Sequence, residues 1–205
     1  FRRVLFRSIN ENGNDADGID SNGDIVISGG TVMVSVTDSG SNCALDYGSE
    51  SGGELIINGG TVVAYGSSSM IEEVSDDSTQ ASILWVLSSG VDAGAEFSVT
   101  DPSGNILISG ESSCAFSSVI VSSPDMTVGE TYDLVAGDES ASVTLSETAT
   151  TEGSVGGMGG MGGMGGMGGM MGNASASGDS AMDAANPMSF DDSMMDSNEM
   201  MPSGD

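Results

Sequence analysis

Positive charge is almost absent from this chain. Its three basic residues, Arg2, Arg3 and Arg7, all lie in the first eight of 205 positions, and it has no histidine. From residue 9 onward, 31 carboxylates therefore stand without any cationic side chain. Clustered like charges are unfavourable unless water or a bound cation screens them. Because no side chain here can neutralise phosphate, the sequence argues against binding to nucleic acid or to an anionic membrane surface.

Long apolar runs and cysteines are scarce too. No stretch approaches the roughly 20 apolar residues of a membrane-spanning helix, so we expect no membrane insertion. The two cysteines, Cys43 and Cys114, could pair in an oxidising compartment, but two buried thiols are the favoured interpretation. No signal peptide is visible. The acidic, Ser-, Gly- and Thr-rich composition nevertheless favours an extracellular or cell-surface location.

A repeat with an offset of 30 residues dominates the next part of the chain. Residues 23–34 read GDIVISGGTVMV, and residues 53–64 read GELIINGGTVVA. In each copy two short runs of alternating apolar residues flank a Gly-Gly pair, and glycine permits the backbone angles of a sharp corner. Short strands, sharp corners and a fixed period are typical of a parallel β-helix, in which each coil stacks on the last. We therefore predict parallel β-helix coils over residues 9–70, with an antiparallel meander as the alternative.

The opening segment FRRVLFRS resembles the in-frame translation of a common sequencing adapter. We therefore leave residues 1–8 out of the fold prediction, as is done for other foreign segments. On this interpretation we expect further coils upstream of residue 9. A solenoid usually needs about three or more repeats to bury its core, and only two coils are predicted here.

The remainder divides into a second strand-rich region and a tail. Residues 71–81 are a polar connection, and residues 82–146 contain short strand-like runs between turns, which predicts a small antiparallel β module that covers the last coil. Residues 101–104 (Asp-Pro-Ser-Gly) predict a hairpin turn within it. Residues 147–205, with their Gly-Gly-Met array, are predicted to be a disordered tail, because such a chain cannot offset its ordering entropy by burial. Methionine thioethers also bind Cu(I), but a low-complexity linker is the favoured interpretation.

The acidic segment NDADGIDSNG, residues 14–23, raises the question of what balances its charge. The later ALD at residues 44–46 repeats GID at residues 18–20 with an offset of 26. The two aspartates are therefore predicted to stack at the inter-strand spacing of about 5 Å, where carboxylates share a proton or a cation. Oxygen-rich turns suit Ca2+, and plain solvated turn residues are the alternative. The predicted calcium ligands are Asp15, Asp17, Asp20 and Asp46.

Several motifs in sequence order resemble one family. The segments DGIDSNGDIVISGGTV, ALDY, GGTVVAYGSSSM and VIVSSPDMTVGETYDL together resemble secreted bacterial carbohydrate-binding β-helix proteins, which are similar in fold to polysaccharide lyases. The resemblance covers roughly residues 12–146. It implies a right-handed parallel β-helix, bound calcium, and binding of plant-type or acidic polysaccharide without cleavage. It assigns the calcium ligands to Asp15, Asp17 and Asp20, with Asp46 next.

We predict that this is not an enzyme, because the base of a lyase is missing and, although carboxylates are plentiful, no cleft-forming element can be identified. A lyase needs a base, usually Arg or Lys beside calcium, and a glycosidase needs two opposed carboxylates in a cleft. Tyr47 and Tyr65 are outward-facing candidates for sugar contact, with ordinary turn or edge packing as the alternative. The sequence thus predicts calcium-dependent binding of polysaccharide. A structural or adhesion stalk without specific glycan binding is the competing prediction.

Overall fold

The structure of the chain is a computed structural model, and it describes four ranges within one compact unit, Phe1–Met161: residues 5–6, 16–38, 42–69 and 71–155. The part of the predicted tail beyond residue 155 lies outside the described residues. The described part is all-β, as predicted, apart from one 3-10 turn at Ser49–Ser51. No helix in these four ranges is long and apolar enough to cross a bilayer.

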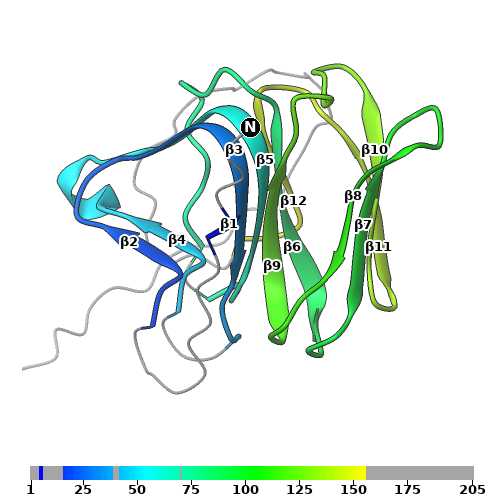
Figure 1. Cartoon of the computed structure of the whole chain (residues 1–205), viewed down its shortest axis with the longest axis horizontal. Helices are drawn as coiled ribbons and strands as arrows, with labels where there is room; N and C mark the ends of the chain where they lie inside the picture. The colour runs from blue at the N-terminus through cyan, green and yellow to red at the C-terminus, as the bar shows by residue number, and fades with distance from the viewer. Residues whose placement is uncertain (1–4, 7–15, 39–41, 70, 156–205) are drawn as a thin grey trace, which may run out of the picture. The chain divides into compact units, whose positions relative to one another are not determined.

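A six-stranded mixed sheet forms the middle layer of this unit (Figure 1). Its strands, in order across the sheet, are β1 (Leu5–Phe6), β3 (Ile25–Ser35), β5 (Leu55–Gly66), β9 (Phe116–Ser122), β6 (Ser82–Val91) and β12 (Ala149–Glu152). The strands β1, β3 and β5 run parallel to one another, whereas β9 is antiparallel to both β5 and β6. The strand β12 then pairs in parallel with β6.

Both sequence offsets reappear in the strand register. Ile25 pairs with Leu55, at the predicted offset of 30, when β3 lies beside β5. The short strands β2 (Ile19–Ser21) and β4 (Leu45–Tyr47) form a separate parallel pair at the predicted offset of 26. The parallel pairing of the two repeats is therefore confirmed, and the antiparallel alternative is wrong for these strands.

The Gly-Gly corners explain how β3 and β5 bend without breaking their pairing. Gly30 and Gly60 adopt φ values of +87° and +96°, a region that favours glycine because it has no Cβ. Gly60 also lies directly against the preceding corner, since a Cβ added there would come within 2.7 Å of the Gly30 carbonyl oxygen. A Cβ added at Gly30 would meet nothing within 4 Å. The two corners are therefore stacked, and the second is tightly enclosed.

The predicted antiparallel module is divided between two sheets. Four of its strands form an antiparallel sheet in the order β11-β10-β7-β8, while β6 and β9 extend the middle sheet beyond β5. The predicted turn is present, because the Asp101 carbonyl accepts a hydrogen bond from the Gly104 N–H at 2.9 Å. The described strands also continue past residue 146, where the module was predicted to end, since β12 follows. The four strands are β7 (Glu96–Thr100), β8 (Ile106–Glu111), β10 (Thr131–Ala136) and β11 (Glu139–Thr144).

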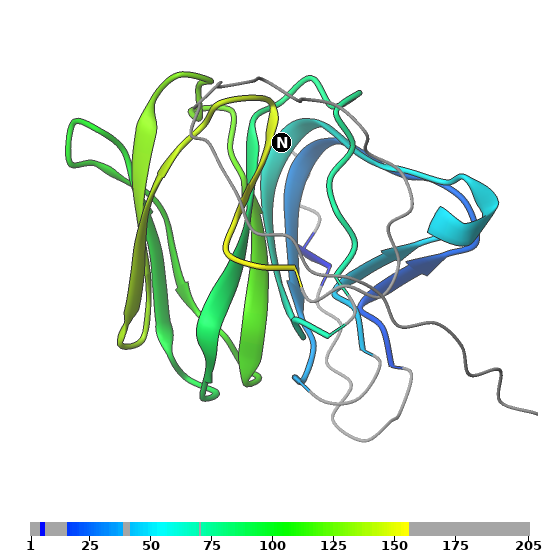
Figure 2. The same cartoon turned by 180° about the vertical axis from the view of Figure 1, so that it is seen from behind.

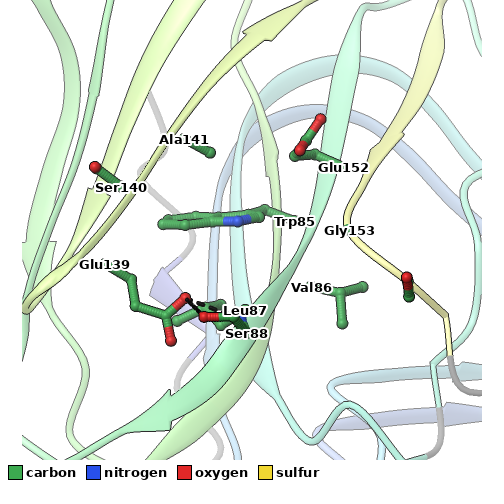
Figure 3. A pocket seen from close by; sticks show the side chains of 10 residues that line it. Trp85, Val86, Leu87, Ser88, Glu139, Ser140, Ala141, Glu152 and Gly153 are labelled. Atoms are coloured by element: carbon green, nitrogen blue, oxygen red, sulfur yellow. Dashed lines mark hydrogen bonds between the residues drawn. The ribbon is translucent and has the colours of Figure 1, made fainter.

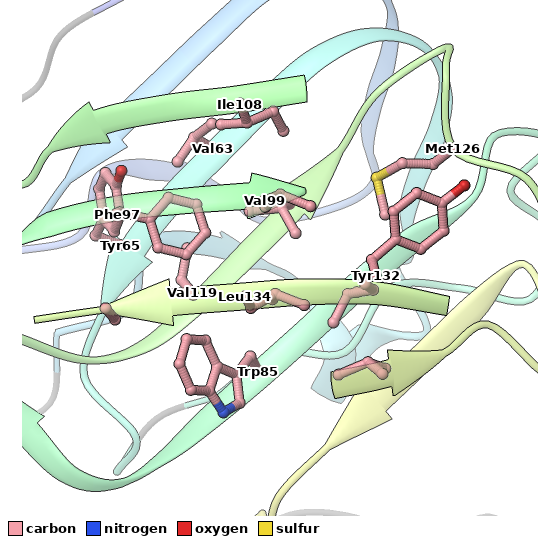
Figure 4. Packing of buried hydrophobic residues seen from close by; sticks show 14 of the residues in the cluster. Val63, Tyr65, Trp85, Phe97, Val99, Ile108, Val119, Met126, Tyr132 and Leu134 are labelled. Atoms are coloured by element: carbon pink, nitrogen blue, oxygen red, sulfur yellow. The ribbon is translucent and has the colours of Figure 1, made fainter. Parts of the chain in front are cut away.

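The middle sheet lies between the β2–β4 pair on one side and the four-stranded sheet on the other (Figures 1 and 2). A hydrophobic core lies on each of its two faces. One core joins the bent repeats to β4 and includes Leu45, Leu55 and Ile57, none of which is exposed. The other core fills the space between the middle sheet and the four-stranded sheet (Figure 4). The middle sheet therefore has apolar residues on both faces, which is typical of a sheet covered on both sides.

Candidate functional site

An acidic corner lies where β2 and β4 run side by side. Asp20 pairs directly with Asp46 in the parallel register, as the sequence predicts. Residues paired in this way point to the same face of a sheet and are separated by the spacing of neighbouring strands, about 5 Å. Asp20 is exposed and Asp46 is half-buried. The fold thus brings together two carboxylates that the sequence separates by 26 positions.

A third acidic level, not predicted from the sequence, follows at the same offset. Glu72 lies 26 residues after Asp46, and the Ser49 hydroxyl donates a hydrogen bond of 3.0 Å to the Glu72 carboxylate. Beside it, the Tyr47 hydroxyl donates to the Glu73 carbonyl at 3.2 Å. Ile71 packs against the same core as Leu45. We call Asp20, Asp46 and Glu72 the acidic ladder.

A signal for the third level was present in the sequence. An apolar residue precedes each carboxylate of the ladder, in the pairs Ile19-Asp20, Leu45-Asp46 and Ile71-Glu72. The segment 71–81 was interpreted only as a polar connection because it lacks the Gly-Gly corner that marks the two full repeats. The recurrence of the apolar–acidic pair at the offset of 26 was the available signal for Glu72.

Of the other two predicted calcium ligands, the structure describes only Asp17. The Asp17 carboxylate accepts a hydrogen bond of 2.6 Å from the Cys43 N–H, so it links the first coil to the second through the backbone. Asp15 lies outside the described residues. Asp17 is therefore a structural residue of the turn as well as a source of negative charge at the ladder.

The electrostatics of the ladder are those of a site without its counter-charge. Partial burial, and then the charges of Asp17, Glu72, Asp20 and Glu50, raise the pKa of Asp46 to about 6. Burial also raises the pKa of Glu72, although the hydrogen bond from the Ser49 hydroxyl opposes this. A neighbouring cation would have the opposite effect. The described residues contain no Lys, Arg or His that could supply one.

The raised pKa predicts that the metal-free protein becomes more stable on mild acidification. The Asp46 carboxyl has an ordinary pKa of 3.8 and a folded pKa of about 6, so folding takes up a proton between these values. The stabilisation from this proton is lost as the pH rises through about 6. Lowering the pH from about 7.5 to about 5.5 in chelator should therefore raise the free energy of unfolding, by at most about 1 kcal/mol because solvent screens this half-exposed group.

Urea unfolding at several pH values measures this effect, and Asp46→Asn provides the control. The asparagine cannot titrate, so the pH dependence of its stability should be flatter than that of the unsubstituted chain. A slope that is the same in both proteins would show that Asp46 does not carry the effect.

The donor set fits calcium in type but not in arrangement. Ca2+ takes six to eight oxygen ligands, typically carboxylates, backbone carbonyls and water. The ladder supplies carboxylates only, one from each level. Among the described residues, no three or more His, Cys, Asp or Glu side chains converge to hold a metal ion. A calcium ion at the ladder would therefore complete its coordination with water or with oxygens of a ligand.

The two tyrosines that were predicted to contact sugar differ in their burial. Tyr47 is half-buried at the acidic corner. Tyr65 is only 2% exposed. Its ring packs edge-on against Phe97, at 5.5 Å between ring centres, and at a tilt against Phe116, at 4.8 Å. The prediction that Tyr65 faces outward is therefore wrong (Figure 4). The physical reason is that the second sheet covers the face of β5 that would otherwise meet solvent.

The two cysteines are buried and not bonded to each other, in agreement with the favoured interpretation. Burial raises the pKa of the Cys43 thiol to about 12. A thiol with so high a pKa is a poor nucleophile, since the thiolate is the reactive form. Cys43 therefore adds packing rather than chemistry to the acidic corner.

Comparison of the chain with protein-family models, with curated proteins and with solved structures gives no match. The function must therefore be argued from the residues of this chain. The features available for that argument are the acidic ladder, the half-buried Tyr47 beside it, and the lack of basic side chains in the described ranges.

Proposed function

We propose that this chain is a non-catalytic, calcium-dependent carbohydrate-binding module of a secreted or cell-surface bacterial protein. Its bent parallel repeats would be coils of a right-handed parallel β-helix, as the resemblance of the motifs implies. Its ligand would be a plant-type or acidic polysaccharide. The observation that carries the proposal is the register of Asp20 with Asp46, with the Glu72 charge nearby and no cationic partner among the described residues.

The ladder residues would hold the ion, and the ion would link them to an acidic glycan. Asp20 and Asp46 offer carboxylate oxygens on one face of the β2–β4 pair. Glu72, which accepts a hydrogen bond from Ser49, adds a carboxylate near Asp46. Bound calcium supplies positive charge that attracts the carboxylates of a uronic-acid polymer. Without it, this strongly acidic chain would repel such a polymer. Tyr47 is next to Asp46 on β4 but packs against the apolar core, so only the exposed part of its half-buried side chain would contact a sugar there.

The same residues support binding rather than cleavage. A lyase must remove a proton with a base while positive charge stabilises the developing anion. The described ranges contain no Lys, Arg or His for that role. The only thiol at the acidic corner, Cys43, is buried and has a raised pKa. We therefore propose no catalytic residue.

Binding to polygalacturonate is expected to depend on calcium and on the ladder. Adding EDTA, or replacing Asp46 by asparagine, should weaken binding on the order of tenfold, equivalent to about 1.4 kcal/mol. Pull-down on immobilised polygalacturonate, with and without EDTA, measures this. The matched control is Asp133→Asn, which removes the same charge from an exposed position on β10, in the other sheet. Binding that EDTA leaves unchanged would contradict calcium bridging.

A structural or adhesion stalk is the second candidate function, and one observation favours it. Tyr65, one of only two aromatic side chains predicted to contact sugar, is buried in the core. A glycan array probed with the full chain distinguishes the two functions, because a stalk gives no selective hits. A melting temperature measured with and without calcium separates a metal site from a glycan site, since a ligand of the folded state raises the melting temperature.

A further inference from the structure

A pocket of about 490 Å3 opens beside Trp85, on the opposite face of the middle sheet from the acidic ladder. It lies between β6, β12 and β11, where the edges of the two sheets meet (Figure 3). Its volume falls within the about 300–1,000 Å3 that is usual for small-ligand sites. No residue of the ladder lines it. It is therefore a separate cavity.

Trp85 and Glu152 are placed together by the strand register. Glu152 on β12 pairs directly with Trp85 on β6, so both side chains point to the same face. Gly153 keeps these strands close, because it has φ of +97° and any side chain there would collide with the Val86 carbonyl. Trp85 is 4% exposed, so only a narrow part of its ring is open to a ligand. That opening suits a compact group better than a sugar ring stacked face to face.

A second carboxylate, that of Glu139 on β11, lines the opposite side of the pocket (Figure 3). The N–H and hydroxyl of Ser88 donate to one of its oxygens, each at 2.9 Å. The N–H and hydroxyl of Ser89 donate to the other, at 2.7 and 2.8 Å. Partial burial alone would raise the pKa of Glu139, but these four hydrogen bonds hold it below its usual value. The carboxylate is thus fixed in position and ionised.

The chemistry of the pocket favours an organic cation. An indole ring attracts a cation through its face, and tryptophan is the most effective aromatic residue for this. Two carboxylates, Glu139 and Glu152, add negative charge on either side, and no basic side chain in the described ranges balances them. Calcium is less suitable, because the indole offers no oxygen ligand. A protonated amine matches both the ring and the carboxylates, since its N–H groups can donate to Glu152, while Glu139, whose oxygens already accept four hydrogen bonds, contributes its negative charge.

We propose that the Trp85 pocket binds the protonated amino group of an amino sugar, between the Glu139 and Glu152 carboxylates and over the indole ring. The pocket is then a second carbohydrate contact, for a cationic sugar, on the face opposite the ladder. The choice of a sugar as carrier of the amine rests on the proposed carbohydrate-binding function. The preference for an ammonium group rests on the pocket alone.

The test uses the full chain and the emission of its single tryptophan. Short glucosamine oligomers are titrated at slightly acidic pH, in EDTA, so that the calcium proposal plays no part in the result. We expect a saturable change in Trp85 emission with glucosamine oligomers and none with their N-acetylated equivalents, which keep the ring but lose the charge. Glu152→Gln, which removes one carboxylate with little change in shape, should weaken binding about fivefold.

The matched control is Glu130→Gln, which removes the same charge from an exposed residue outside the pocket and should leave the affinity unchanged. Equal weakening by both substitutions would mean diffuse attraction to an acidic chain and would overturn the proposal. An equal response to the N-acetylated oligomers would exclude the ammonium group as the recognised feature. A stronger response to Nα-acetyl-lysine amide than to glucosamine would overturn the assignment to a sugar.

Discussion

Replacement of Tyr65 by alanine is expected to lower the free energy of unfolding by about 3–5 kcal/mol. The side chain is 2% exposed, and its ring contacts Phe97 from one sheet and Phe116 from the other. Its removal would leave a cavity between two sheets that cannot close around it. Urea unfolding followed by circular dichroism measures the change.

Two other tyrosine substitutions make this result specific. Tyr65→Phe keeps the ring and should cost less than about 1 kcal/mol. Tyr47→Ala removes a half-buried ring whose hydroxyl donates one hydrogen bond, and it should cost about 1 kcal/mol. If Tyr65→Ala proved as mild as Tyr47→Ala, the face of β5 that carries Tyr65 would not be covered by the second sheet.

Gly60→Ala is expected to destabilise the chain by about 2–5 kcal/mol, compared with about 1–2 kcal/mol for Gly30→Ala. Both positions have a positive φ, which costs an L-residue about 1–2 kcal/mol. Only at Gly60 would the new Cβ also press against backbone, at 2.7 Å from the Gly30 carbonyl oxygen. That overpacking adds about 1–3 kcal/mol.

The comparison of the two glycines tests the stacking of the corners rather than the corner itself. Because the positions are equivalent in the repeat, their intrinsic backbone costs cancel in the difference. Equilibrium unfolding of the two single variants gives that difference directly. Equal losses would show that the second corner does not lie against the first.

The parallel pairing could be predicted because the sequence repeats its constraints. The Gly-Gly corner recurs at an offset of 30, and the apolar–aspartate pair recurs at 26, so both registers follow from matching like with like. The four extra residues between these offsets lie around the Ser49–Ser51 turn. Repetition of this kind specifies the neighbour of each residue without a model of the whole fold.

The burial of β5 on both of its faces could not be predicted in the same way. Alternation along β5 indicates that Val62 and Ala64 face one core, and this is correct. The same alternation leaves Val63 and Tyr65 on what would be the outer face, yet both belong to the other core. Their burial depends on β6, β9 and the four-stranded sheet, which are distant in sequence and carry no repeat. Apolar residues on both faces were the available signal.

The candidate sites also differ in whether their residues belong to the repeat. Asp20 and Asp46 were predicted because they belong to the repeat, whereas Glu72 was missed because its level lacks the glycine corner. The Trp85 pocket brings together β6, β11 and β12, and no short-range pattern relates these strands. Residues 147–155 were expected to be unstructured, so Glu152 was excluded from any site in advance.

The reversal of strand direction between β5 and β9 makes the stack of repeats one-sided. A further coil would need to lie parallel to β5, but β9 already occupies that edge in the antiparallel sense. The strand-rich module therefore acts as a terminator, of the kind that repeat proteins need at their ends. Any extension of the stack, by more of the same chain or by another copy, can proceed only from the opposite edge of the sheet, where β1 pairs with β3. Such polarity also limits the edge-to-edge aggregation to which unpaired strands are prone.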